Sequence, residues 1–287
     1  MSVQYSVKHS LKVARWQARR FETAIKWGAK ELDRMPIVFG NAMPKSGSHL
    51  IIQVLQGLTH LGPFVNPGFP PVNRTEDNRK LSDNDILGNL SKMRPGDIGY
   101  GYIGAQPKFI ETLTADNKAT IFIYRDPRDM IVSHVFYASQ MHKTHWMYTY
   151  YNEKLTSMEE RINAAIVGVT EAGSELTPVR KRYNGYLGWL DEPSVLSLKF
   201  EKLILEREFA LGELLDYLEG LGFNPSAERQ SAIQVLDAGI APSKSGTFRK
   251  GQPGNWREYF TTDNIKTFKE NTGDLLFRLG YESDNSW

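Results

Sequence analysis

Apolar residues along the chain fall in short runs that alternate with amphipathic stretches. The runs PIVFGN (36–41), GDIGYGYIG (96–104), ATIFIY (119–124) and PSVLSLKF (193–200) predict four strands. Helical patterns are predicted at 47–61, after Pro127, at 206–223 and near 262–279. Strands that alternate with helices predict an α/β fold, a single domain with a mostly parallel central sheet flanked by helices. Ligands then bind at the carboxyl ends of the strands.

Residues 8–34 predict an amphipathic helix with a wide apolar stripe and many basic positions elsewhere. The stripe consists of Leu11, Ala14, Ala18, Phe21, Ile25 and Leu32. We expect this stripe to dock the helix on the domain, with its basic face in solvent; binding to a membrane surface or a partner helix is the alternative. We find no repeat and no clear linker, so we expect an N-terminal helix at 1–35 and one domain at 36–287.

The amino-acid composition argues against several classes of function. A net charge of +2 over 287 residues gives no argument for nucleic acid, and 40% apolar content is ordinary for a globular protein. With no cysteine there can be no disulfide, thiolate nucleophile or zinc–thiolate site, which favours a reducing compartment. The N-terminus lacks the apolar core of a signal peptide, and no run approaches the roughly 18 apolar residues of a membrane span. We therefore expect a soluble, cytoplasmic protein.

A loop of small and basic residues follows the first predicted strand. In MPKSGSHL, backbone N–H groups at a strand-to-helix turn would converge on one oxyanion, with Lys45, Ser46 and Ser48 adding donors. This P-loop-like turn does not satisfy the nucleotide-binding pattern G-x-x-x-x-G-K-[ST], and Pro44 lacks the N–H that such a loop aims at phosphate. A capped helix start with a surface lysine is the alternative.

Two further segments carry groups suited to phosphate. Arg125 follows the strand 119–124, and Ser133 lies about two turns into the next helix, which Asp126 is well placed to cap. In FRKGQPGNW, the adjacent Arg249 and Lys250 with Gly251 form a loop able to close on a doubly charged phosphate. A strand-end arginine paired with a nearby aspartate, and a solvated basic turn, are the alternatives.

Together the three segments resemble the sulfotransferase family that uses 3′-phosphoadenosine 5′-phosphosulfate (PAPS). PKSGSHL is similar to its P-K-S-G-T-T-W loop, YRDPRDMIVS to its strand-end Arg with a Ser eight residues later, and RKGQPGNWREYFT to its R-K-G-x-x-G-D-W-K-x-x-F-T loop. The resemblance covers roughly residues 36–280, with the motifs in the family's order.

The resemblance implies roles for single residues. Lys45 would contact the bridging oxygen of the 5′-phosphosulfate, and the phosphate itself would be cradled by Ser46, Gly47, Ser48 and His49. The 3′-phosphate would be held by Arg125, Ser133, Arg249, Lys250 and Gly251. Phe200 would lie beside the adenine, with Phe248 as a further aromatic candidate. The family implies no metal, and no Asp/Glu/His set has metal-ligand spacing.

The chain departs from the family's pattern at the position of the general base. Many members have a histidine in a K-T-H-L-P-like stretch, where GYGYIGAQP here has Tyr102, a poor general base unless a cation lowers its pKa. The base stays open between Tyr102 and His134. Leu50 replaces a tryptophan, and Asn255 an aspartate. The same helix face as Ser133 carries Phe136, Tyr137 and Gln140, which we interpret as acceptor-pocket wall.

These residues predict sulfuryl transfer from PAPS to a hydroxyl or amine of a small-molecule acceptor, by a monomer or homodimer. A P-loop phosphotransferase and a degenerate PAPS-binding relative without turnover are the alternatives.

Overall fold

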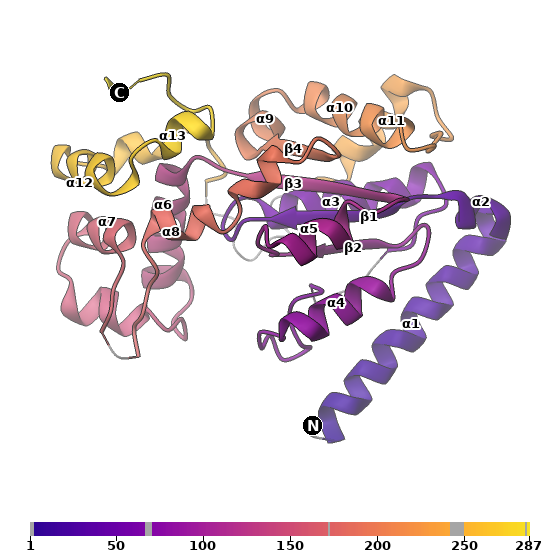
Figure 1. Ribbon diagram of the computed structural model, residues 1–287, viewed down its shortest axis with the longest axis horizontal. Coiled ribbons are helices and arrows are strands. Elements are labelled where there is room, and N and C mark those ends of the chain that lie inside the picture. Colours follow the sequence, from indigo (N-terminus) through magenta and orange to yellow (C-terminus); the bar gives the residue numbers. More distant parts are fainter. Residues whose placement is uncertain (1–2, 67–70, 172, 242–249, 285) are drawn as a thin grey trace. The chain divides into compact units, whose positions relative to one another are not determined.

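The computed structural model describes residues 3–66, 71–171, 173–241, 250–284 and 286–287 (Figure 1). Its contacts divide the chain into two compact units. Unit 1 comprises Met1–Tyr124 and Gly188–Lys244, and unit 2 comprises Arg125–Leu187 and Ser245–Trp287. The expected boundary at residue 35 lies inside unit 1, and the assignment of domains stays a prediction.

The described sheet of unit 1 has four strands in the order β2-β1-β3-β4, and every neighbouring pair is parallel. The strands are β1 (Ile37–Ala42), β2 (Ile98–Gly101), β3 (Lys118–Tyr124) and β4 (Val195–Lys199). All six residues of β1 are buried, as expected for a central strand that is covered on both faces. The predicted α/β fold with a parallel sheet is confirmed.

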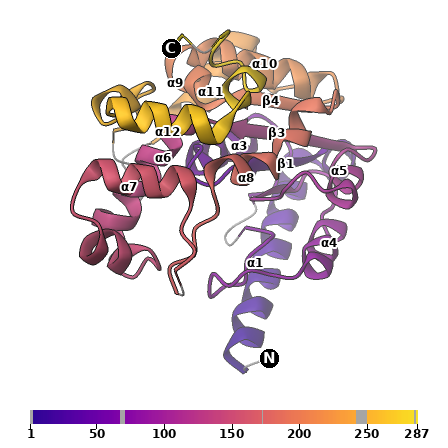
Figure 2. The same ribbon diagram turned by 60° about the vertical axis from the view of Figure 1, so that its left-hand side comes forward.

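Helices of unit 1 precede the sheet, connect its strands or follow its last strand, β4. They are α1 (Val3–Trp27), α2 (Ala29–Arg34), α3 (Ser48–Leu61), α4 (Asp83–Ser91), α5 (Pro107–Leu113), α9 (Phe200–Leu205), α10 (Arg207–Glu219) and α11 (Arg229–Ala238). In Figures 1 and 2, α9, α10 and α11 lie on one side of the sheet, and α4 and α5 lie on the other. Apolar residues of α3, α10 and α11 form one buried core with β1 and β3. This packing holds α3 against the sheet and so fixes the position of the segment between β1 and α3.

Unit 2 contains no strand among its described residues. It is built from α6 (Pro127–Phe136), α7 (Met158–Val167), α8 (Val179–Asn184), α12 (Thr262–Thr272), α13 (Leu275–Arg278), the π-helices η1 (Tyr137–Met141) and η2 (Tyr150–Lys154), and the 3₁₀-helix η5 (Asn255–Glu258). As predicted, Asp126 caps α6: its side chain accepts a hydrogen bond from the N–H of Arg128, and Pro127 takes the first helical position.

A buried arginine connects α6 to the C-terminal residues of unit 2. Arg128 forms ion pairs with Asp126 and Glu282, and its guanidinium lies 4.2 Å from the ring of Trp256 and 4.5 Å from that of Trp287. A buried charge costs free energy unless it is paired, so these partners together make the burial of Arg128 tolerable.

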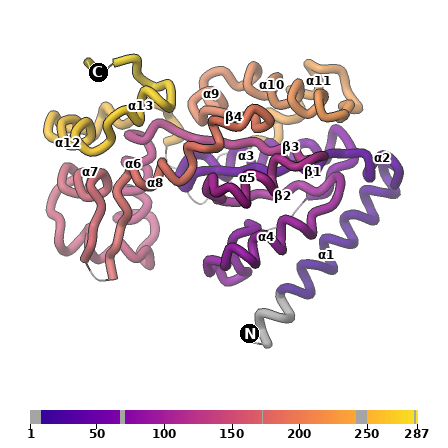
Figure 3. Tube along the Cα trace, viewed as in Figure 1, coloured from indigo at the N-terminus to yellow at the C-terminus, as the bar shows by residue number. Residues whose placement is uncertain are grey.

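The N-terminal helix contacts unit 1 through a different face from the one expected. The predicted helix 8–34 is divided at Gly28, whose φ is 95°, and Figure 3 shows the chain changing direction there. Leu32 is buried, but Leu11, Phe21 and Ile25 are exposed. The prediction that the apolar stripe docks α1 is therefore wrong. On α1, the stripe faces away from the rest of unit 1.

Polar contacts of α1 with Asp97 explain this orientation. Asp97 is buried and accepts hydrogen bonds from Nε1 of Trp16 at 3.0 Å and from Nη1 of Arg20 at 2.9 Å. The guanidinium of Arg94 stacks 4.3 Å from the ring of Trp16. The residues that dock α1 thus include an arginine and an indole, which an apolar pattern does not identify.

We predict that Asp97→Ala lowers the free energy of unfolding by about 3 kcal/mol, because it leaves the buried Arg20 guanidinium without its paired carboxylate. Urea denaturation measures this change. Asp33→Ala is the matched control, since Asp33 is exposed and lies 3.8 Å from the same arginine. Equal effects of the two substitutions would contradict this account of how α1 docks.

Candidate active site

The segment between β1 and α3 forms a tight turn at the carboxyl end of a central strand. The N–H of Met43 donates to the carbonyl of Ile123 in β3, and the N–H of Ser46 donates to the carbonyl of Met43. Lys45 has φ of 67° and Gly47 has φ of 96°, so two residues of the turn adopt the left-handed region. A lysine in that region stores strain, which the surrounding structure must offset, and such strain is concentrated at functional sites.

Gly47 is required in this turn for two reasons. Its φ suits glycine, and a Cβ added there would lie 2.6 Å from Cδ2 of Phe200 and 3.3 Å from Cδ1 of Ile123. Phe200 is itself buried in the core of unit 1. The predicted residue Phe200 therefore supports the turn directly, while its contact with adenine stays a prediction.

The turn contains a buried hydroxyl and the start of a helix, the kinds of group that bind anions in proteins. The hydroxyl of Ser46 is buried and forms no hydrogen bond within the described part of the chain. The first turn of α3 has backbone N–H groups without intrahelical partners, and the helix dipole favours negative charge there. A buried hydroxyl without a partner costs free energy, and a bound oxyanion would supply the missing acceptor.

His49 in the first turn of α3 is expected to be neutral at neutral pH. Burial, and then the neighbouring charge of Lys45, lower the pKa of His49 below its usual range. A neutral imidazole contributes a hydrogen-bond donor or acceptor but no positive charge. Lys45 is then the ionised side chain that the turn itself supplies.

Tyr102 lies beside this turn. Its hydroxyl donates a hydrogen bond of 2.9 Å to Oγ of Ser48. Because that contact uses an acceptor lone pair of Ser48, the serine's own hydrogen stays available for an oxyanion. One of the two candidate bases is thus within reach of the predicted phosphate loop.

Two buried asparagines hold the backbone around Tyr102. The amide of Asn41 donates to the carbonyl of Ile103 and accepts from its N–H, both at 2.9 Å. Asn73 bonds both backbone groups of Tyr102 in the same way, at 3.2 and 3.3 Å. The segment after β2 thereby continues in an extended, hydrogen-bonded form that positions the tyrosine.

In unit 2, Arg125 lies beside a buried carboxylate. Oδ2 of Asp129 is 3.7 Å from Nη2 of Arg125 and accepts from the N–H of Gly254 at 2.7 Å. Its Oδ1 accepts from the N–H of Trp256 at 2.8 Å. Asp129 therefore connects the predicted 3′-phosphate arginine with the turn that follows Lys250 and Gly251.

Burial raises the pKa of Asp129 above its usual range, while Arg125 and the two backbone N–H groups act in the opposite direction. Burial and favourable partners are both expected to act on the pKa of a carboxylate that is buried in order to hold other groups in position.

The remaining predicted 3′-phosphate residues are partly described. Ser133 is half-buried on α6, and Gly251 has a positive φ of 64°. Nζ of Lys250 lies 2.6 Å from Oε2 of Glu258, and this hydrogen bond raises the pKa of Lys250. Phe248 and Arg249 lie outside the described residues.

His134, the other candidate base, is buried in a cluster of rings in unit 2. Its ring centroid lies 5.6 Å from that of His145, 5.9 Å from Tyr151 and 6.5 Å from Trp146. Its role as a base stays a prediction.

The residues predicted to line the acceptor pocket lie where the α-helix α6 ends and the π-helix η1 begins. Phe136 ends α6 and packs edge-to-face on Tyr259 at 5.0 Å, whereas Tyr137 and Gln140 belong to the π-helix η1. The rotation of 100° per residue that placed these residues on one face does not apply in a π-helix. Their joint role as an acceptor wall stays a prediction.

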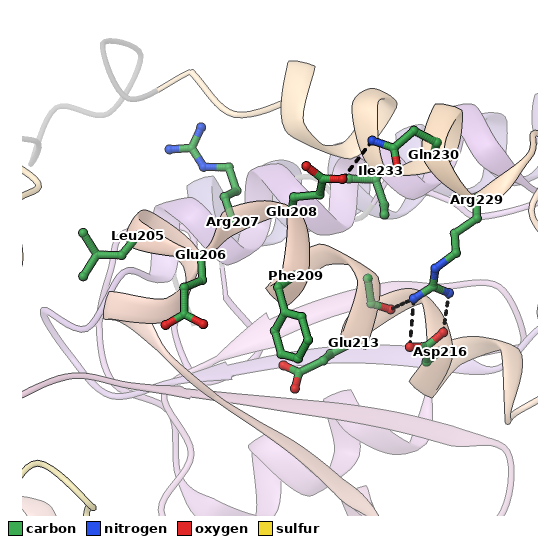
Figure 4. A pocket seen from close by; sticks show the side chains of 11 residues that line it. Leu205, Glu206, Arg207, Glu208, Phe209, Glu213, Asp216, Arg229, Gln230 and Ile233 are labelled. Atoms are coloured by element: carbon green, nitrogen blue, oxygen red, sulfur yellow. Dashed lines mark hydrogen bonds and ion pairs between the residues drawn. The ribbon is translucent and has the colours of Figure 1, made fainter.

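Within the described residues, no group of three or more His, Cys, Asp or Glu side chains is placed to hold a metal ion, and no helix is long and apolar enough to cross a membrane. A groove of about 620 Å³ in unit 1 lies at α10 and α11 (Figure 4). It is lined by charged pairs such as Arg229 with Asp216, and none of the predicted site residues lines it.

Comparison with known proteins decides the family. The family model described as Sulfotransferase domain matches residues 38–280. The chain belongs to the sulfotransferase family. Flavonol 3-sulfotransferase of Flaveria bidentis is 25% identical over 196 residues, which are 59% of this sulfotransferase chain and 58% of that protein. Cytosolic sulfotransferase 11 of Arabidopsis thaliana is 25% identical over 178 residues, 56% of this chain and 47% of that protein. The chain thus spans about half the length of these curated relatives.

Solved structures share the fold of this chain. Mouse sulfotransferase SULT7A1 complexed with PAP matches with a TM-score of 0.55 and 16% identity, over 88% of this chain and 92% of that one. Retinol dehydratase in complex with androsterone and inactive cofactor PAP matches with a TM-score of 0.54 and 16% identity, over 86% and 83%. At this identity the likeness shows the fold.

The sequence pattern did not assign a role in the candidate site to three residues that position it, Asp129, Asn41 and Asn73. It indicated Asp129 only as an acidic residue of the first helical turn and a possible partner of Arg125. Asn41 ends the apolar run of β1, and a buried amide at a strand end is the signal that could have found it.

We predict that Gly47→Ala lowers the free energy of unfolding by about 2–4 kcal/mol, because the left-handed backbone and the overlap with Phe200 each add a cost. Gly222→Ala is the matched control. Gly222 also has positive φ, 91°, but a Cβ there meets nothing within 4 Å, so it should cost only about 1 kcal/mol. Urea denaturation of both variants measures the difference, and equal losses would mean that Phe200 does not support the turn.

Proposed function

We propose that this protein transfers a sulfuryl group from PAPS to a hydroxyl or amine of a small-molecule acceptor. The observation that carries the proposal is the turn Lys45–Ser48, where a strained lysine and a buried serine hydroxyl without a partner meet the start of α3. Sulfotransferase family membership and the fold shared with PAP complexes support the choice of donor.

The residues present fit the 5′ end of such a donor. Ser46 offers a buried hydroxyl, Ser48 a hydroxyl oriented by Tyr102, and α3 its N-terminal backbone N–H groups. A phosphate group would satisfy all three, since each lacks or can share an acceptor. Pro44, which removes an N–H from the turn, fits the family's P-K-S-G pattern better than a nucleotide loop.

For the 3′-phosphate, the proposal uses groups of unit 2. Arg125 presents a planar guanidinium whose orientation Asp129 fixes, and the same carboxylate holds the turn next to Lys250 and Gly251. Bidentate recognition of phosphate by arginine depends on a fixed guanidinium plane. Lys250, now paired with Glu258, would exchange that partner for the phosphate.

PAPS supplies an activated sulfuryl group whose leaving oxygen gains negative charge as the bond to sulfur breaks. Lys45 would stabilise that charge, and it would do so more strongly in the transition state than in the ground state. Ser46, Ser48 and the α3 N-terminus would bind and orient the phosphate, so most of the catalysis is positioning and charge neutralisation.

On the acceptor side, Tyr102 is the better placed of the two candidate bases, because its hydroxyl already contacts the loop through Ser48. Tyrosine is a weak general base at neutral pH, so the hydroxyl or amine that we propose as acceptor is one that loses its proton readily. Such an acceptor needs little proton removal before it attacks sulfur. We further propose that the protein works in the cytoplasm on small molecules.

Dependence on magnesium separates this proposal from a P-loop phosphotransferase. Sulfuryl transfer by the described groups uses no metal, whereas phosphoryl transfer from a nucleotide uses magnesium to neutralise the phosphates. Transfer that persists in EDTA supports the sulfotransferase, and transfer abolished by EDTA supports the kinase.

We predict that 3′,5′-diphosphoadenosine raises the melting temperature far more than AMP does, and that Asp129→Asn reduces this difference. Without a fully charged carboxylate to hold Arg125 and the turn at Gly254, affinity for the diphosphate should fall about 10–100-fold, while the effect of AMP stays unchanged. Thermal shift titration with both ligands measures this, and AMP controls for general loss of stability. Asp116→Asn, on the surface of unit 1, is the matched control. Equal stabilisation by AMP and the diphosphate in the unmodified protein would exclude the 3′-phosphate site.

We predict that Lys45→Ala lowers kcat by about 10²–10³ and changes the Kd of the diphosphate only a few fold, because the lysine acts on the leaving oxygen. Single-turnover rates and equilibrium binding measure the two quantities separately. Lys92→Ala, at the exposed end of α4, should change neither. A variant that loses affinity but keeps kcat would show that Lys45 has no leaving-group role.

A further inference from the structure

An exposed apolar stripe runs along α1 on the side that does not contact the rest of unit 1. Leu11 is 52% exposed, Phe21 is 68% exposed and Ile25 is 70% exposed. Ala14 and Ala18, between them on the same face, are exposed as well. Large apolar side chains gathered on one face are typical of an interaction surface.

This stripe is not needed for the fold of unit 1. α1 docks through Trp16 and Arg20, which lie on the opposite side of the helix and bond Asp97. The match to the sulfotransferase domain begins at residue 38, so α1 precedes the part that this chain shares with its family.

The spacing of the stripe is that of a helix which packs on another helix. Successive positions 11, 14, 18, 21 and 25 are separated by three and four residues in alternation. Apolar residues at this heptad spacing form the seam of two-stranded coiled coils, where side chains of one helix insert between those of the other.

We infer that α1 pairs with α1 of a second copy of this chain in an antiparallel arrangement. In that arrangement Ala18 of each helix faces Phe21 of the other and Ala14 faces Ile25, while Leu11 lies opposite the C-terminal end of the other helix. Phe21 and Ile25 then each meet an alanine, which is how interdigitated layers fill space without voids. A parallel arrangement would instead place Phe21 on Phe21 and alanine on alanine.

The charges at the edge of the stripe also favour the antiparallel pair. Arg15 and Glu22 are both exposed and lie seven residues apart on one edge. A two-fold axis between antiparallel helices brings Arg15 of one copy near Glu22 of the other, twice. The other edge carries the uncharged Ser10, Gln17 and Ala24, so no like charges meet there.

A second copy fits this face better than an anionic lipid surface. A second copy supplies Arg15 as a partner for Glu22, whereas an anionic headgroup layer would place like charge against Glu22 at the edge of the stripe. A helix pair of this length is smaller than a standard protein interface, and we therefore expect dimerisation in the micromolar range.

Sedimentation velocity of the full chain, from low micromolar to submillimolar concentration, tests the pairing. We expect a monomer–dimer equilibrium, with dimerisation at least 100-fold weaker in Phe21→Asp. Arg15→Glu and Glu22→Arg alone should each weaken the dimer roughly tenfold, because both copies then bring like charges together. The double variant R15E/E22R should restore the affinity, since it restores opposite charges.

The four variants alter exposed side chains, so their melting temperatures at low concentration should match that of the unmodified protein. A monomer at all concentrations overturns the inference. A dimer that survives Phe21→Asp, or that the double charge reversal fails to restore, overturns it too. Sedimentation with phosphatidylserine vesicles provides the other test. Binding that Phe21→Asp abolishes, in a protein that stays monomeric, would assign the stripe to a lipid surface instead.

Discussion

The turn between β1 and α3 is the constraint on which the rest of the site depends. It places two residues, Lys45 and Gly47, in the left-handed region of backbone conformation, and only a rigid surrounding can maintain that strain. Phe200 packs where any larger residue than Gly47 would lie, and the carbonyl of Ile123 fixes the start of the turn. The hydrophobic core thus determines the conformation of a polar loop. That loop leaves the Ser46 hydroxyl buried without a partner, which costs stability, and we propose that a bound phosphate supplies the missing acceptor.

Buried polar side chains position the neighbouring segments. Asn41 and Asn73 extend the hydrogen-bonded backbone past the end of β2 and so place Tyr102 against Ser48. Asp129 does comparable work in unit 2, where one carboxylate orients Arg125 and the turn that ends at Trp256. These residues position other residues and are not themselves predicted to contact the ligand, so a motif defined by ligand contacts does not include them. A buried polar group is tolerated only when its bonds are made, so each of them also fixes a unique arrangement.

The sequence predicted the parts of the fold that local pattern determines. Short apolar runs identified the four strands of the described sheet, the glycine-containing run 96–104 among them, and Asp126 with Pro127 identified the start of α6. The pattern did not reveal which face of α1 docks, because Trp16 and Arg20 contribute polar bonds to Asp97 rather than apolar area. The helical wheel also failed beyond Phe136, since the π-helix η1 changes the rotation per residue. Motifs indicated Lys45, Ser46 and Arg125 by chemistry. Asp129 lies only four residues after Arg125, but it is 125 residues from Gly254. Asn41 and Asn73 are likewise 62 and 29 residues from the backbone groups that they bond, so local spacing carries no signal for these contacts.

The central claim is that the turn Lys45–Ser48 holds the 5′-phosphate of an adenosine 3′,5′-diphosphate. A crystal structure of the protein with this nucleotide bound tests that claim most directly. We expect a phosphate oxygen at hydrogen-bonding distance from Oγ of Ser46 and from the N–H groups that begin α3, with Tyr102 still donating to Ser48. A nucleotide bound with its phosphate elsewhere, and with the Ser46 hydroxyl still lacking a partner, would contradict the account.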